Sequence, residues 1–135
     1  MRMQKIATLT FAFIAFLFSC SPKVTSDELA GVYKVRYPYG TEELQLAKDG
    51  TYIQSVLIDG ESTVKTNKGR WEFKKEESKV ILTDAMIVDD FFGHLRPAYW
   101  KIEPGLSIFS VKKSFGKLSL LINPDQGFIF KKISK

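Results

Sequence analysis

Alternating apolar and polar residues dominate this 135-residue chain from residue 29 onward. In the segment 31–37, for example, Tyr33, Val35 and Tyr37 alternate with Lys34 and Arg36. Successive side chains of a β-strand point to opposite faces of a sheet, so this pattern predicts a strand with one buried face. Similar segments recur about every 8 to 12 residues, and none past residue 30 has sustained helical spacing, which indicates an all-β domain.

Tight turns separate the predicted strands. The pairs Asp49–Gly50 and Asp59–Gly60 bound a strand predicted at Thr51–Ile58, because an Asp-Gly pair readily takes the positive φ of a hairpin turn. Short hairpins make neighbours in sequence neighbours in the sheet, so the strand order should be an up-and-down antiparallel meander. A meander of this length leaves two free edges unless it closes on itself, which predicts a barrel.

We expect about eight or nine strands in this barrel. The higher count treats Asn67–Gly69 as a turn between separate strands at Ser62–Thr66 and Arg70–Lys74. It also includes a strand at Pro97–Glu103, after an interruption of the hairpin rhythm. A single helical turn at Thr25–Ala30, with Ser26 as its cap, is compatible with the sequence ahead of the first strand. Closure at about eight strands leaves an interior just large enough for side chains or one small ligand.

The first twenty residues have the architecture of a secretory leader. Arg2 and Lys5 precede an apolar run, Ile6–Phe18, and the small residue Ser19 precedes Cys20. This order is typical of a signal peptide. Two other interpretations remain: an ordinary cleaved leader with an incidental cysteine, and a membrane-spanning anchor. The apolar run is, however, shorter than the roughly 20 residues that a membrane span needs.

Cys20, directly after the small residue that closes the leader, resembles the lipobox cysteine of bacterial lipoproteins. The resemblance implies that residues 1–19 are removed, that Cys20 is acylated and anchors the chain in a lipid bilayer, and that 20–28 form a tether to a domain at 29–135. It places the protein in the bacterial cell envelope. Ser21 stands where an aspartate often marks inner-membrane retention, which favours the outer membrane and a domain facing the periplasm.

Several motifs resemble the lipocalin-like domains of bacterial envelope lipoproteins. They are Gly31-Val32-Tyr33, Asp49-Gly50-Thr51-Tyr52 and Gly69-Arg70-Trp71, within a resemblance that covers Leu29 to Asp84. True lipocalins carry gly-x-trp on their first strand, where this chain has Gly31-Val32-Tyr33. The resemblance implies a calycin-type barrel and says little about its cargo.

Charge and cysteine content exclude some classes of partner. The net charge is +5, and without the leader it falls to about +3, which is too mild for a nucleic-acid-binding surface. With a single cysteine, no disulfide forms within the chain, and we expect a monomer stabilised by its core. Five lysines near the end of the chain either face an anionic partner or lipid headgroups, or are solvated edge residues: Lys112, Lys113, Lys117, Lys131 and Lys132.

The segment Asp84–Arg96 interrupts the hairpin rhythm and combines apolar with charged residues. It is a candidate lid or partner-docking loop, because function concentrates on such loops. The candidate partner-binding residues are Phe91, Phe92, His94 and Arg96. The alternative is that the apolar residues of this segment plug one end of the barrel while its acidic residues face water.

Metal binding and catalysis are not expected. His94 is the only histidine, whereas a zinc site needs three or four nitrogen or sulfur ligands. Asp89 and Asp90 adjoin in sequence and point apart on an extended backbone, so they cannot flank a substrate as an acid pair. No gly-x-ser-x-gly nucleophile motif is present. We therefore expect neither a cofactor nor an enzyme.

Aromatic residues on the predicted strands allow two functions. They line an apolar pocket for a small apolar or amphipathic ligand, or they fill a solid core of a protein-interaction or inhibitor module. The candidate ligand-binding residues are Tyr33, Tyr52, Trp71, Trp100 and Phe128. The segments 51–58 and 106–113 carry apolar groups on both faces, which predicts that the loop at 84–96 or a partner covers their outer face.

Overall fold

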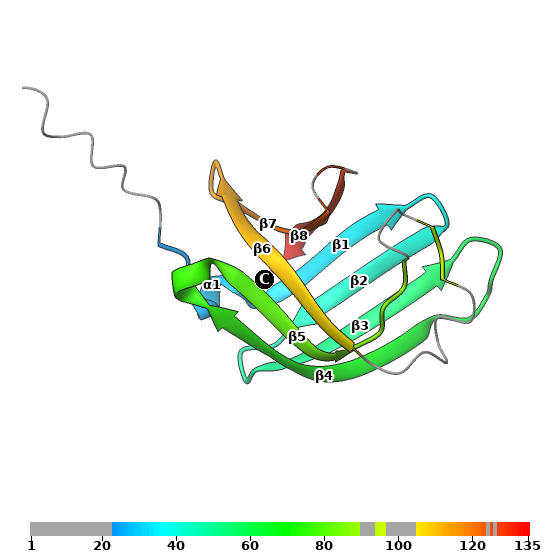
Figure 1. The fold of residues 1–135 in the computed structure, drawn as a ribbon, viewed down its shortest axis with the longest axis horizontal. Helices are drawn as coiled ribbons and strands as arrows, with labels where there is room; N and C mark the ends of the chain where they lie inside the picture. The colour runs from blue at the N-terminus through cyan, green and yellow to red at the C-terminus, as the bar shows by residue number, and fades with distance from the viewer. Residues whose placement is uncertain (1–22, 90–93, 97–104, 124, 126) are drawn as a thin grey trace, which may run out of the picture.

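A computed structural model describes residues 23–89, 94–96, 105–123, 125 and 127–135. These residues form a closed barrel of eight antiparallel strands in sequence order, in which the last strand pairs with the first (Figure 1). The predicted all-β, up-and-down barrel is confirmed. Among the described residues, no helix is long and apolar enough to cross a membrane.

The strands are β1 (Gly31–Tyr37), β2 (Gly40–Leu46), β3 (Thr51–Ile58), β4 (Lys65–Lys74), β5 (Lys79–Ala85), β6 (Gly105–Ser114), β7 (Lys117–Asn123) and β8 (Phe128–Ser134). A short helix, α1 (Ser26–Leu29), precedes β1, and a 3-10 turn, η1 (Lys75–Glu77), joins β4 to β5.

The prediction of two strands separated by a turn at Asn67–Gly69 is wrong, because these residues lie inside the continuous strand β4. Position 69 requires glycine, because a Cβ atom there would clash with the Tyr52 ring at 2.7 Å and with the Thr83 carbonyl oxygen at 2.5 Å. The Asn67 side chain donates to the Asp84 carbonyl on the neighbouring strand β5. Both residues thus serve the barrel interior rather than a turn. The strand expected at Pro97–Glu103 lies outside the described residues.

Most of the barrel interior is filled by side chains. Tyr33, Tyr52 and Phe130 are the largest of those that are completely buried. The rings of Phe109 and Phe130 meet edge to face, with their centroids 5.5 Å apart. Inward residues from all eight strands join this one cluster or pack against it, so this part of the barrel has the close packing of a solid core.

The two ends of the barrel differ, and we name them by what lies there. The helix end carries α1, the β2–β3 turn, η1 and the β6–β7 hairpin tip (Figure 1). Thr25, rather than the expected Ser26, caps α1, because its hydroxyl accepts from the Glu28 N–H while the Glu28 carboxylate accepts from the Thr25 N–H. Leu29 of α1 is completely buried and closes this end.

The loop end carries the β1–β2 and β3–β4 turns and the described residues between β5 and β6, which are 86–89 and 94–96. Val88 from this chain is buried against Val56 and Ile58 of β3, on the inward face of that strand. On the outward face, Ile53 and Leu106 remain 38% and 58% exposed. The described part of the 84–96 loop therefore packs over the barrel end and leaves the outer apolar residues of β3 and β6 uncovered.

Candidate functional site

A pocket of about 640 Å³ opens at the loop end of the barrel. Most of its wall is apolar, and the wall is formed by five strands and by the chain that follows β5. The described residues that line it are Tyr37, Glu42, Gln54, Met86, Ile87, Val88, Asp89, Arg96, Leu106, Ser107, Ile108, Phe109 and Ile122. Pockets of this size and composition suit a small molecule with an apolar body.

Strand pairing is less regular near this pocket. The β6–β7 ladder ends at the pair Ser110–Leu121, so Gly105–Phe109 of β6 extend beyond it. The β5–β6 register also shifts between Leu82 and Ala85, where Asp84 has a φ of 58°. A register shift of this kind bends a strand away from its partner. The part of β6 that is not paired with β7 supplies Leu106, Ser107, Ile108 and Phe109 to the pocket wall.

Glu42 is a carboxyl group buried in this pocket. It lies on the inward face of β2 in phase with Leu44 and Leu46, and only 5% of it is exposed. Gln54 donates a hydrogen bond of 2.6 Å to Glu42 Oε1. Burial raises the pKa of Glu42 to about 7, although hydrogen bonds from Gln54 and Tyr37 oppose this rise, and nearby Asp89 adds to it. Near neutral pH, this carboxyl group is therefore poised between its protonated and ionised forms.

Side-chain amides hold the backbone where the chain leaves β5, beside the pocket. Gln54 Oε1 accepts from the Met86 N–H at 2.9 Å, and Gln54 Nε2 donates to the Met86 carbonyl at 2.8 Å. Asn67 Nδ2 donates to the Asp84 carbonyl at 2.7 Å. These contacts replace strand hydrogen bonds where the chain leaves β5, as buried backbone groups require partners. The Gln54 amide thus bonds both to the Met86 backbone and to the Glu42 carboxyl group, which lines the pocket.

The polar atoms of three predicted ligand-binding residues are bonded to the backbone. The Tyr33 hydroxyl donates to the Leu29 carbonyl at 2.8 Å, and the Tyr52 hydroxyl donates to the Thr83 carbonyl at 2.8 Å. The Trp71 indole N–H donates to the Ala47 carbonyl at 2.7 Å. All three residues belong to the main core and none lines the pocket at the loop end. The structure places them as core residues.

The other two predicted ligand-binding residues differ. The Phe128 ring meets the ring of Tyr37 edge to face, with centroids 5.0 Å apart, and Tyr37 lines the pocket. Phe128 therefore packs against a residue of the pocket wall and does not itself line the pocket. Trp100 lies outside the described residues, as does the predicted acylation site Cys20.

Two of the four predicted partner-binding residues, His94 and Arg96, lie in the described part of the chain between β5 and β6. Phe91 and Phe92 fall outside the described residues. Asp89 pairs with Leu95 in an isolated β-bridge, and the Arg96 N–H donates to the Val88 carbonyl at 2.9 Å. Arg96 lines the pocket and His94 is exposed. The chain thus doubles back across the loop end and brings Arg96 to the pocket wall.

Glu42 is the residue that the sequence analysis missed. The sequence contained a signal for this residue, because the alternation that buries Leu44 and Leu46 puts Glu42 on the same inward face of β2. A charged residue in phase with a buried face points to a polar site inside the barrel. Across the described residues, no three His, Cys, Asp or Glu side chains gather as a metal site.

Comparison with known proteins adds no relative. Neither a protein-family profile, nor a curated protein, nor a solved structure matches this chain.

Proposed function

We propose that this protein is a lipid-anchored component of the bacterial cell envelope whose lipocalin-like barrel binds a small amphipathic molecule without catalysis. The observation that carries the proposal is the apolar pocket at the loop end with the buried Glu42 carboxyl group inside it. An apolar wall with a few converging polar groups is the usual composition of a small-molecule site. The anchor is supported by the leader sequence that ends at Cys20.

The chemistry of the pocket narrows the class of ligand. Glu42 and Asp89 supply carboxylate oxygens to one region of the wall, and the Gln54 amide is already bonded to Met86. The polar head of the ligand should therefore donate hydrogen bonds to these carboxyl groups, and a hydroxyl group could also accept one from Arg96 in the same wall. The apolar body would lie against Ile87, Phe109 and Ile122.

A protein partner is the second candidate function. It is favoured by Leu106 and Ile108 at the rim of the pocket, which are 58% and 48% exposed. Exposed apolar side chains around a pocket rim also occur where a partner docks. The filled core near the helix end suits either function, so the contents of the pocket decide between them.

Native mass spectrometry of the protein purified from membranes in mild detergent tests the ligand proposal. We expect a mass in addition to that of the acyl groups. Extraction with organic solvent should remove this additional mass, because the cargo is not covalently bound. Ser107→Trp places a large side chain in the pocket and should abolish this mass. Ser110→Trp is the matched control, because Ser110 faces outward on the same strand and is exposed.

The outcome separates the two functions. A wild-type protein that carries only its acyl groups contradicts small-molecule binding and favours the interaction module. Equal cargo in Ser107→Trp and Ser110→Trp would place the ligand elsewhere. The anchor is tested independently by metabolic labelling with palmitate, which Cys20→Ser should prevent.

A further inference from the structure

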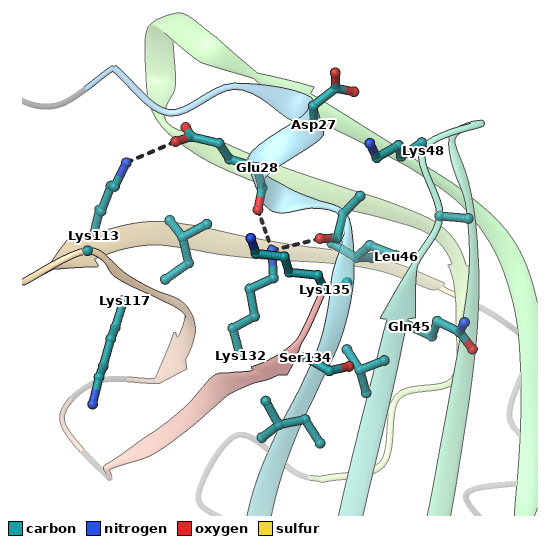
Figure 2. A pocket seen from close by; sticks show the side chains of 17 residues that line it. Asp27, Glu28, Gln45, Leu46, Lys48, Lys113, Lys117, Lys132, Ser134 and Lys135 are labelled. Carbon is teal, nitrogen blue, oxygen red and sulfur yellow. Dashed lines mark hydrogen bonds and ion pairs between the residues drawn. The ribbon is translucent and has the colours of Figure 1, made fainter.

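A second pocket, of about 790 Å³, lies at the helix end of the barrel. It is bordered by α1, the β2–β3 turn, the β6–β7 hairpin and the end of β8 (Figure 2). Five lysines and two acidic residues line it: Lys48, Lys113, Lys117, Lys132 and Lys135, with Asp27 and Glu28. This end of the molecule therefore presents a basic surface, which we call the basic pocket.

Only some of these lysines are used by the fold. Lys132 donates to the Glu28 and Ala30 carbonyls, and Lys113 forms an ion pair of 3.0 Å with the Glu28 carboxylate (Figure 2). The exposed lysines Lys48, Lys117 and Lys135 form no ion pair with any described residue. Their charges are available to an anionic partner.

The rest of the helix end is closer to neutral. In η1, Lys75 is followed by Glu76 and Glu77, and Glu77 pairs with Lys79 at 3.1 Å. The excess positive charge is thus confined to the side formed by the β2–β3 turn, β6–β7 and β8. A flat anionic surface would contact this side first.

Phe115 projects from the same side and the fold does not account for it. It forms the two-residue β6–β7 turn with Gly116, and its side chain is fully exposed. Its φ of 49° lies in the left-handed region, which Asn and Gly adopt more readily than an aromatic residue. Neither packing nor turn geometry therefore favours phenylalanine. An exposed aromatic residue between Lys113 and Lys117 is typical of a segment at a membrane interface.

The chain itself limits how far this end can lie from a bilayer. Cys20 precedes Thr25, the cap of α1, by five residues, which span at most about 17 Å. The helix is fixed to the barrel by the buried Leu29 and by the hydrogen bond from Tyr33 to its carbonyl. If Cys20 is acylated, as proposed above, the helix end must stay within this distance of the headgroups.

We propose that the helix end docks on a bilayer that contains anionic lipids, with Phe115 in the interfacial region and Lys48, Lys117 and Lys135 against the headgroups. The inference rests on the proposed anchor. It adds an orientation: the pocket with Glu42, at the opposite end of the barrel, faces the aqueous compartment. Two weak signals, an acyl anchor and a basic patch, reinforce each other on a membrane.

Site-directed spin labelling of the acylated protein in vesicles tests this orientation. Ser114→Cys places a nitroxide beside Phe115 without removing it, and Glu61→Cys places one at the loop end as the matched control. Both positions are exposed. The vesicles contain phosphatidylcholine alone or mixed with phosphatidylglycerol, and the measurement is the accessibility of each label to oxygen and to a water-soluble nickel chelate.

We expect the ratio of oxygen to nickel accessibility at position 114 to be at least about three-fold higher than at position 61, and higher still with phosphatidylglycerol. Adding Phe115→Asn should lower it in both vesicles. The variant with Lys48→Glu, Lys117→Glu and Lys135→Glu should lose the increase due to phosphatidylglycerol. Equal accessibility at the two positions overturns the proposal, as does an unchanged lipid dependence in the lysine variant.

The same samples separate this inference from the anchor and from a soluble ligand. Acylation blocks the thiol of Cys20, so each chain should take up one label. Two labels per chain would show that Cys20 is free and that the anchor proposal fails. One label per chain with an aqueous position 114 refutes docking alone. If inorganic phosphate, but not chloride at equal ionic strength, releases position 114, the basic pocket recognises a free phosphate instead.

Discussion

At the scale of single residues, Glu42 combines a cost in stability with a position in the pocket wall. Burial raises its pKa to about 7 from the ordinary 4.5. A carboxyl group that holds its proton more tightly in the folded state makes stability fall as the pH rises between these two values. Ionisation of this buried carboxyl group near neutral pH therefore costs stability, and such sites are often functional.

The first prediction follows from this titration. Wild-type protein should lose up to about 3 kcal/mol of unfolding free energy between pH 4.5 and pH 8 through Glu42. Glu42→Gln keeps an acceptor for Gln54 and removes the charge, so its stability should depend less on pH. Urea denaturation at pH 5 and pH 8 measures the difference.

The neighbouring residue supplies the control for this experiment. Glu43 is exposed on the outward face of β2, and Glu43→Gln should retain the pH dependence of the wild type. If wild type and Glu42→Gln had the same pH dependence of stability, the pKa of Glu42 in the folded protein would be close to its ordinary value. The proposed ligand head would then meet a permanent carboxylate.

At the scale of elements, a substitution at the β6–β7 hairpin tip should have opposite effects on stability and on membrane contact. Asn readily adopts the φ that Phe115 adopts in the two-residue turn before Gly116. Phe115→Asn should therefore raise the unfolding free energy by about 0.5–1 kcal/mol, while it weakens contact with vesicles. Thermal or urea denaturation in detergent measures the first effect.

A control variant distinguishes turn geometry from loss of an exposed apolar group. Phe115→Val removes the ring but keeps a residue that is unfavourable at positive φ. It should be no more stable than the wild type. If Phe115→Asn were destabilised, the phenylalanine would contribute to folding, and the argument from its exposure would fail.

Strand β4 shows where prediction from sequence reaches its limit at this scale. Alternation and Asp-Gly turns correctly located β1 and β3, because local chemistry decides both. The same rules divided β4 at Asn67–Gly69. In the structure, Gly69 makes room for Tyr52, and Asn67 binds the Asp84 carbonyl. Both reasons depend on residues distant in sequence, which turn propensity does not contain.

The candidate site was harder to predict than the fold for a related reason. Aromatic residues on strands look alike in sequence whether they line a pocket or fill a core. Tyr33 and Tyr52 can be buried in the core because their hydroxyl groups donate hydrogen bonds to the Leu29 and Thr83 carbonyls. The pocket formed instead where β6 extends past its ladder with β7, a consequence of register and not of composition.

At the scale of the whole molecule, the two ends of the barrel carry different pockets. The basic pocket and Phe115 lie at the helix end, and Glu42 and Arg96 line the pocket at the loop end. A closely packed core separates them. Distant sites without shared partners act independently, so docking on the membrane should orient the loop end without changing its affinity.

The last prediction tests this independence with variants at both ends. The combined Lys48→Glu, Lys117→Glu and Lys135→Glu variant should lose the dependence of docking on anionic lipid and retain the cargo mass of the wild type. Ser107→Trp should lose the cargo and keep the accessibility of a label at position 114. A protein that carries all four substitutions should show both losses at their separate sizes. If the lysine variant lost its cargo although Ser107 is unchanged, the two ends would not be independent. The ligand would then enter from the membrane surface, and the helix end would contribute to ligand binding.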